Sequence, residues 1–174
     1  MKHLPSFSIQ TLIDQLPGEH FDTNEFIRNS ITLKYYTLAE FIHDKFPKNK
    51  FSMINLNIAS LSAHIDKLRS LISILAHPFD VICLSETKIR KYKPLFNFEI
   101  NGYEFVHEKS PLHCGGTGIY VISVYNPIEV GKYSGSHPKI DESVFVEIKI
   151  PSNKKLLIGC IYRHPSSAVS DFIN

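Results

Sequence analysis

The chain has 174 residues, about the size of one domain, and hydrophobic residues make up 43% of it, which argues against a chain that is disordered throughout. With 19 basic and 17 acidic residues, the net charge of +2 gives no overall sign of nucleic-acid binding, although a local basic patch is compatible with it. The number of cysteines is odd, and the three residues, Cys83, Cys114 and Cys160, form no CxxC pair. This pattern argues against a disulfide framework and favours a reducing, intracellular compartment.

Residues 1–50 are polar and acidic in several stretches, and we interpret them as a partly disordered linker that carries one short helix at residues 37–45. Thr37 and Glu40 have the spacing of a capping box, and Pro47 ends the helix. The first ten residues lack the basic start and apolar centre of a signal peptide. No apolar run reaches 18 residues, so we expect no membrane partner.

A strand–helix–strand pattern begins at residue 51. Residues 51–57 are mostly apolar and predict a strand, and residues 79–84 are continuously apolar, which favours a strand buried on both faces. Between them, Ser60 or Ser62 can cap a helix. The apolar stripe of that helix is spaced by three and four residues and consists of Leu61, Ile65, Leu68, Ile72 and Leu75.

This order of elements predicts where polar residues meet. Two parallel strands joined by a crossover helix share a sheet, and their carboxyl ends lie at one edge, where open α/β sheets bind ligands. Asn57 ends the first strand and Glu86 follows the second, so the topology brings them to one rim.

The rest of the chain is mainly β. Strands are predicted at residues 103–107, 119–125, 143–150 and 156–162, and the last, almost continuously apolar, is predicted to be central in its sheet. The glycines at positions 115, 116 and 118 are interpreted as a turn rather than a phosphate cradle, because no helical pattern follows them.

Four segments in this order, residues 56–61, 80–88, 115–121 and 161–167, resemble the endonuclease domain of jockey-like non-LTR retrotransposons, a branch of the endonuclease/exonuclease/phosphatase superfamily. The resemblance implies an α/β fold that is the N-terminal part of a four-layer α/β sandwich (DNase I-like), with one mixed β-sheet, a flanking helix and a largely missing second sheet. Residues 51–174 would form an incomplete domain of this kind.

The resemblance also implies a function. Members of this branch are Mg²⁺-dependent endonucleases that nick target DNA, and the freed 3′ end primes reverse transcription; Mn²⁺ can replace Mg²⁺. The implied partners are DNA and, in a full-length element, a downstream reverse transcriptase domain in the same polypeptide. The implied location is intracellular, and nuclear when the domain acts on DNA.

By this resemblance, Asn57 and Glu86 match the residues that organise and bind the metal, and Tyr162 matches the tyrosine beside the substrate phosphate; Arg163 is a weaker phosphate candidate. The residue types fit, because Mg²⁺ prefers oxygen ligands and keeps several waters, so that one carboxylate and a substrate phosphate can hold it. Each of these residues also has a purely structural alternative. Glu86 can be a solvated loop acid and Asn57 can hydrogen-bond a strand end, whereas Tyr162 can be a half-buried core residue and Arg163 a surface charge.

Departures from the pattern predict lost turnover. Ala59 stands where many relatives carry a second polar residue, and the later Gly-Asp-x-Asn and Ser-Asp-His segments have no counterpart here. The expectation is therefore an inactive, truncated copy. Alternatives are a non-catalytic relic or gene-model fragment, a phosphatase or phosphodiesterase of the same superfamily, and an unrelated α/β interaction module.

The missing second sheet also predicts instability. If about six strands formed one sheet with a bare face of about 500 Å², the lost burial would be on the order of 12 kcal/mol. Because domain stability is typically about 5–15 kcal/mol, aggregation or partial order is expected.

Overall fold

The computed structural model describes residues 37–43, 50–90, 97–110, 114–137, 139–150, 154–168 and 170. The chain divides into a unit of residues 1–37 and a unit of residues 38–174, and the second is described below. Helix α3, Leu38–His43, lies within the predicted short helix. The predicted disorder of residues 1–36 lies outside the described residues, and the division at residue 50 stays a prediction.

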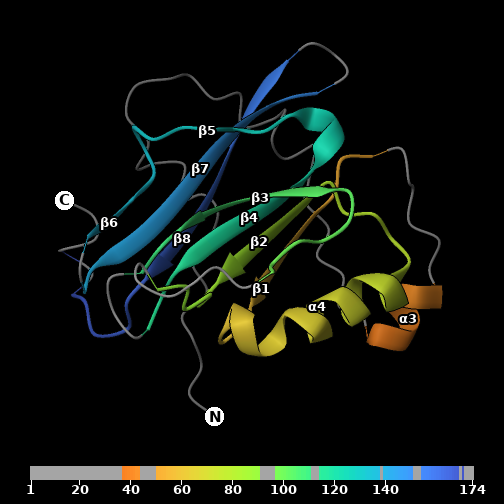
Figure 1. Cartoon of the computed structure of the whole chain (residues 1–174), viewed down its shortest axis with the longest axis horizontal. Helices are drawn as coiled ribbons and strands as arrows, with labels where there is room; N and C mark the ends of the chain where they lie inside the picture. Colours follow the sequence, from red (N-terminus) through yellow and green to blue (C-terminus); the bar gives the residue numbers. More distant parts are fainter. Residues whose placement is uncertain are drawn as a thin grey trace, which may run out of the picture. The chain divides into compact units, whose positions relative to one another are not determined.

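The strand–helix–strand unit is as predicted. Strand β1 (Met53–Asn57) is followed by helix α4 (Leu61–Leu75) and strand β2 (Val81–Ser85), and β1 and β2 pair in parallel with Asn57 opposite Ser85. Strands β4 (Thr117–Ile122) and β3 (Tyr103–Glu108) complete a mixed sheet in the order β1-β2-β4-β3 (Figure 1). The carboxyl ends of β1 and β2 therefore share one edge.

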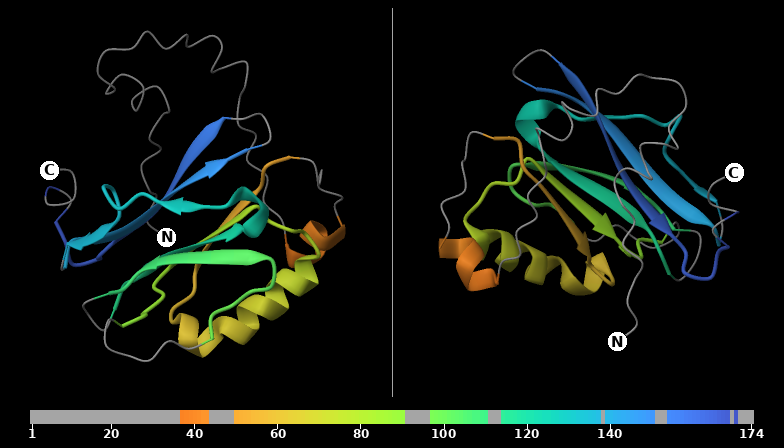
Figure 2. Two further views of the ribbon diagram at one scale, coloured as in Figure 1. Left: turned by 45° about the horizontal axis from the view of Figure 1, so that its top comes forward. Right: turned by 180° about the vertical axis from the view of Figure 1, so that it is seen from behind.

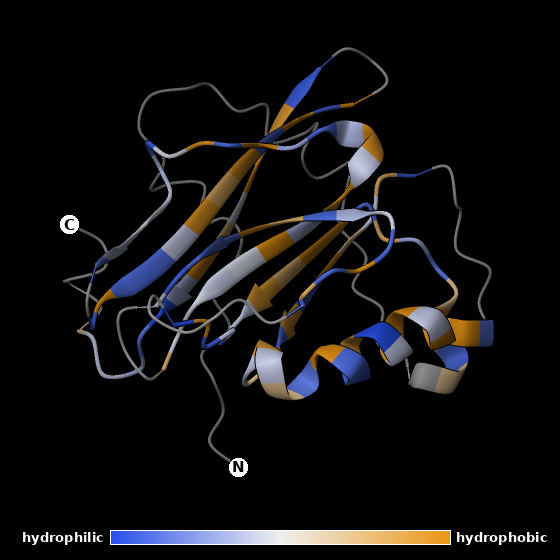
Figure 3. Ribbon diagram, in the orientation of Figure 1, coloured by the Kyte–Doolittle hydropathy of each residue, from blue (hydrophilic) through white to orange (hydrophobic). Residues whose placement is uncertain are grey.

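Helix α4 covers one face of this first sheet (Figure 1). The cluster between them includes Leu61, Ile65, Leu68 and Leu75 from the predicted stripe, together with Ile82, Leu84 and Tyr120 from the sheet, and Phe41 of α3 packs against it. Strand β2 is buried on both sides, as its continuous hydrophobic colouring in Figure 3 suggests. Ser60 stands at the N-cap of α4, but its hydroxyl lies 3.2 Å from that of Ser62 rather than bonding a helix N–H.

The later strands form a second sheet. Strand β7 (Asp141–Lys149) pairs with β8 (Lys155–Arg163) on one side and with the short strands β5 (Ile128–Glu129) and β6 (Gly135–His137) on the other. Residues Ser123–Tyr125, predicted as strand, form a 3-10 helix, η1. The central position predicted for β8 is wrong for the described chain, in which β8 pairs with β7 alone.

The two sheets pack face to face (Figure 2). A cluster of buried residues joins Val81, Cys83, Ile119 and Val121 of the first sheet to Val144, Val146, Ile148, Ile158 and Cys160 of the second. The α/β class with a mixed sheet and a flanking helix is thus confirmed, and the second sheet, expected to be largely missing, has four described strands. The assumption of a single six-stranded sheet with a bare face, on which the predicted instability depended, is wrong, because β7 and β8 cover that face.

The outer face of the second sheet is more exposed. Ile128, Leu157 and Ile161 keep 60%, 54% and 50% of their surface accessible. Leu157 and Ile161 lie on the solvent side because side chains along β8 alternate between the two faces of the sheet, and those on the other face fill the core. Of the helices in the described residues, none combines the length and apolar character that crossing a membrane requires.

Candidate active site

The rim at the carboxyl ends of β1 and β2 holds the first two predicted residues. The Asn57 amide donates a hydrogen bond from Nδ2 to Oε1 of Glu86 at 2.9 Å, and its Oδ1 accepts one from the backbone N–H of Ala59 at 3.0 Å. The parallel register of β1 and β2 brings together two side chains that lie 29 residues apart in sequence. The amide therefore fixes the orientation of the Glu86 carboxylate, whose side chain is 27% exposed.

The loop after β2 is held in an unusual backbone conformation. Glu86 and Lys88 have φ values of 55° and 53°, a left-handed conformation that side chains rarely adopt without tertiary support. That support comes from the glycine turn: the Thr87 and Lys88 N–H groups donate to the carbonyls of Gly116 and Gly115 at 3.0 and 2.9 Å. A Cβ at Gly116 would lie 2.4 Å from Thr87 Oγ1, so the close approach requires glycine. Gly115 and Gly116 thus have the positive φ values expected of turn glycines, whereas Gly118, also interpreted as part of the turn, lies within strand β4.

Tyr162 reaches the same site from the second sheet. Along β8 it lies on the inward side, which also carries Ile158 and Cys160. Partial burial raises the pKa of its hydroxyl, and so do the nearby negative charge of Glu86 and a hydrogen bond to that carboxylate. The phenol is therefore held neutral as a hydrogen-bond donor beside Glu86.

Arg163 does not join the other three. As the next residue along β8 it lies on the exposed outer side, and its Nη1 donates to the carbonyl of Ser167 at 2.8 Å. The structure thus brings together Asn57, Glu86 and Tyr162 and places Arg163 on the opposite face of the second sheet. A phosphate-binding role for Arg163 stays an untested prediction that this placement does not favour.

A buried carboxylate, Glu142, lies behind Tyr162 and was not predicted as a site residue. It is fully buried on β7 directly opposite Tyr162 in the strand pairing. Oε1 accepts a hydrogen bond from Ser110 Oγ at 2.6 Å and lies 3.4 Å from His164 Nε2, and Oε2 accepts one from the Gly116 N–H. Because the same carboxylate binds the glycine turn that supports the 86–88 loop, it links the two sheets at the site.

The sequence carried a signal for Glu142. It continues the alternation of Val144, Val146 and Ile148, so its side chain is expected on the apolar face of β7. A carboxylate on such a face must find hydrogen-bond donors, because an unpaired buried charge is costly. That position could therefore have been identified as one end of a buried polar network.

The side chains at the rim fit one kind of metal site. Glu86 Oε2 is the carboxylate oxygen that Asn57 does not bind, and its partner is the Lys88 ammonium at 3.9 Å. Across the described ranges, no group of three or more His, Cys, Asp or Glu residues is arranged to hold a metal ion. A single carboxylate suits Mg²⁺, which keeps water ligands and shares substrate phosphate oxygens, and does not suit Zn²⁺. Since Asn57 Oδ1 already accepts a bond, the geometry favours Asn57 as the residue that orients Glu86.

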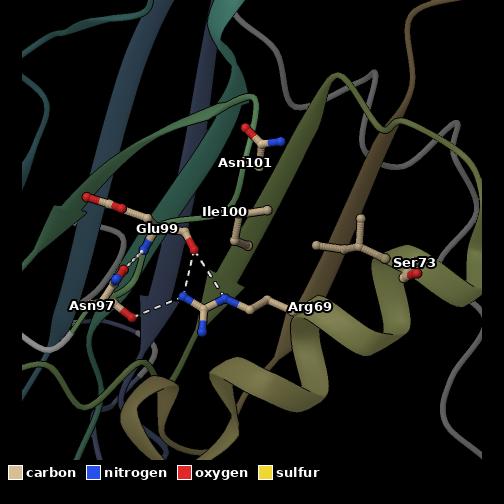
Figure 4. Close-up of a pocket in the computed structure, with 7 residues that line it drawn as sticks. Arg69, Ser73, Asn97, Glu99, Ile100 and Asn101 are labelled. Carbon is tan, nitrogen blue, oxygen red and sulfur yellow. Dashed lines mark hydrogen bonds between the residues drawn. The ribbon is translucent and has the colours of Figure 1, made fainter.

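A hollow between α4 and the segment before β3 is structural (Figure 4). The Arg69 guanidinium extends across it and donates to the carbonyls of Glu99, at 2.7 Å, and Asn97, at 3.2 Å. It also pairs with Asp66 at 2.9 Å. These contacts fasten the helix to the loop and occupy the donors that an anionic ligand would need.

Comparison with known proteins shows the fold alone. No family model matches the chain, and no curated protein matches it. Among solved structures, an AP endonuclease from Leishmania major is 15% identical, with a TM-score of 0.54, over 97% of this chain and 55% of that one. A 3′-5′ exonuclease from Neisseria meningitidis is 18% identical, with a TM-score of 0.41, over 60% of this chain and 39% of that one. An AP endonuclease from Archaeoglobus fulgidus is 16% identical, with a TM-score of 0.38, over 62% of this chain and 40% of that one.

The chain thus spans about half the length of the Leishmania enzyme. The match covers both sheets and α4, and the order of elements agrees with the expected class. The fold of this chain is a DNase I-like α/β sandwich.

Proposed function

We propose that the chain carries the metal-binding half of a nuclease-type phosphodiester hydrolase that uses Mg²⁺, or Mn²⁺ in its place. The observation that carries the proposal is the convergence of Asn57, Glu86 and Tyr162 on one rim of a DNase I-like fold. The three come from β1, the loop after β2 and β8, so their meeting depends on the packing of two sheets. DNA is the proposed substrate, because the similar solved structures include AP endonucleases.

Each side chain has a distinct proposed role. Glu86 holds the cation through Oε2, and Asn57 fixes the direction of that carboxylate. The neutral Tyr162 hydroxyl donates a hydrogen bond to a phosphate oxygen without adding charge. A bound cation in such a site stabilises the negative charge that develops on the phosphate and on the leaving oxygen.

The described residues around Tyr162 are placed to bind a substrate rather than to exchange protons with it. His164, two residues further along the chain, is 3% exposed, with Nδ1 3.9 Å from Cys114 Sγ and Nε2 3.4 Å from Glu142 Oε1. Both ring nitrogens thus face protein groups, and the ring has little access to a substrate water. We therefore propose that this chain binds metal and phosphate but turns substrate over slowly or not at all. The finer proposal, an endonuclease of a non-LTR retrotransposon with a reverse transcriptase domain downstream, rests on the sequence resemblance.

Thermal unfolding in the presence of Mg²⁺ tests the proposal. A ligand that binds the folded state stabilises it by RT ln(1 + [L]/Kd). We expect millimolar Mg²⁺ to raise the melting temperature of the wild type and of Glu104→Gln, a control at an exposed residue of strand β3, but not that of Glu86→Gln. An equal rise for all three proteins would show that the cation binds elsewhere and would overturn the assignment.

A further inference from the structure

A cluster of nucleophilic and titratable side chains lies beside the rim and is not used by the proposed function. Cys114 is exposed, whereas His164 and Glu142 are 3% and 0% exposed. Cys114 Sγ lies 3.9 Å from His164 Nδ1, and the opposite ring nitrogen, Nε2, lies 3.4 Å from Glu142 Oε1. Cys114 lies 28 positions before Glu142 and 50 before His164 in sequence, and the segment before β4, the start of β7 and the residue after β8 bring the three together.

The order thiol, imidazole, carboxylate excludes a shared metal ion. The thiol and the carboxylate face opposite nitrogens of one ring, so that the imidazole separates them and one cation cannot reach both. The same order is the arrangement of an activated nucleophile, in which a base contacts the nucleophile and a third group orients the base. His164 Nε2 is buried without a hydrogen bond of good geometry and faces Glu142, so that it is placed to become the charged end of an imidazolium–carboxylate pair.

We propose that Cys114 is a modification site: a nucleophilic thiol, activated by His164 and Glu142, that reacts with small soft electrophiles. With an alkyl iodide, sulfur forms a bond to carbon, the carbon–iodine bond breaks, and iodide leaves with its electron pair. The thiol proton moves to His164 Nδ1. The ring then carries a proton on both nitrogens, and the Glu142 carboxylate stabilises its positive charge.

The other two cysteines are internal controls. Cys83 and Cys160 are 5% and 6% exposed and lie in the core between the sheets. Trypsin separates all three thiols, because it cuts after lysine and arginine: Cys114 falls in residues 110–132, Cys83 in 70–88 and Cys160 in 156–163. One digest therefore reports the alkylation of each cysteine independently.

The test is the rate of alkylation by iodoacetamide at pH 7, followed by mass spectrometry of the full chain in native buffer and in denaturant. An ordinary exposed thiol reacts through its small thiolate fraction, which is about 3% at pH 7. Unfolding separates Cys114 from His164 and Glu142, the two residues of the activating relay, but leaves the sulfur accessible. We expect native Cys114 to react about fivefold faster than Cys114 in the denatured chain, and the two buried cysteines to react more slowly when native. A native Cys114 that reacts at the denatured rate or below would overturn the proposal.

Substitutions assign the effect to the relay. His164→Gln is expected to lower the native rate of Cys114 to that of the denatured chain, whereas His137→Gln, which removes an exposed histidine paired with Asp141 at 3.1 Å, leaves it unchanged. Circular dichroism reports whether each variant is folded. A folded His164→Gln protein with wild-type Cys114 reactivity would also overturn the proposal, and the wild-type comparison of native with denatured chain decides the matter if that variant does not fold.

Discussion

Replacing Gly116 by alanine tests how the glycine turn positions the metal-binding loop. Gly116 has φ +89°, and an added Cβ would lie 2.4 Å from Thr87 Oγ1 and 3.0 Å from the Lys88 backbone nitrogen. Thr87 is fully buried, so its side chain cannot move aside into solvent. Gly102 is the matched control, because its φ is +82° but a Cβ there would meet no atom within 4 Å.

The two substitutions share one cost and differ in a second. A left-handed backbone costs an L-residue about 1 kcal/mol in both variants, and forced overlap in a packed region adds about 1–3 kcal/mol for Gly116→Ala. For a chain of this size, 1 kcal/mol lowers the melting temperature by about 3 °C. We therefore expect a loss of about 3 °C for Gly102→Ala and about 6–12 °C for Gly116→Ala.

Differential scanning calorimetry measures both losses, and Mg²⁺ titration of the folded variants shows whether the 86–88 loop has moved. Gly116→Ala is expected to lose the Mg²⁺-induced stabilisation that Gly102→Ala retains. Equal melting temperatures for the two variants would refute the claim that the turn and the loop pack too closely for a side chain.

Three further predictions concern pH, helix docking and turnover. The hydrogen bond to Asp80 and partial burial raise the pKa of Tyr125 from 10.0 to about 12. The neutral hydroxyl therefore stabilises the fold below pH 10, and this contribution is lost as the pH rises toward 12. In urea unfolding, the free energy of unfolding should fall less between pH 8 and pH 11 for Tyr125→Phe than for wild type or Tyr133→Phe. Arg69→Met is expected to cost about 2 kcal/mol in urea unfolding, because the bonds from α4 to two loop carbonyls are lost, whereas Lys67→Met on the exposed side of the helix costs under about 0.5 kcal/mol. In a plasmid-nicking assay with Mg²⁺ this chain should leave the plasmid supercoiled, and metal-dependent nicking by purified protein would show that the chain suffices for turnover.

The elements with strong local patterns were predictable from the sequence. The stripe from Leu61 to Leu75 and the apolar run of β2 gave the helix and both parallel strands, because burial of a helix face or of a strand dictates where hydrophobic residues stand. From these elements the meeting of Asn57 with Glu86 followed by topology. The close approach of Tyr162 also needed the family resemblance, because nothing local to β8 indicates what faces it.

Features that depend on long-range packing were not predictable in the same way. An apolar strand such as β8 can stand at the centre of a sheet or against another sheet, and the sequence pattern does not distinguish the two. The extent of the second sheet was therefore underestimated. The buried position of Glu142 could be inferred from alternation, but its partners Ser110 and His164 lie in other segments that only the folded chain brings together.

The most direct test of the central claim is paramagnetic relaxation by Mn²⁺ in the ¹H–¹⁵N spectrum of the folded chain. Mn²⁺ at low occupancy broadens signals from nuclei close to its site. If the cation binds Glu86 beside Asn57 and Tyr162, the signals of the Asn57 side-chain amide and of the backbone amides of residues 86–88 and 162 should broaden together. The Glu86→Gln substitution should abolish this broadening, whereas Glu104→Gln should leave it unchanged. Broadening that spares residue 162, or that survives Glu86→Gln, would contradict the account.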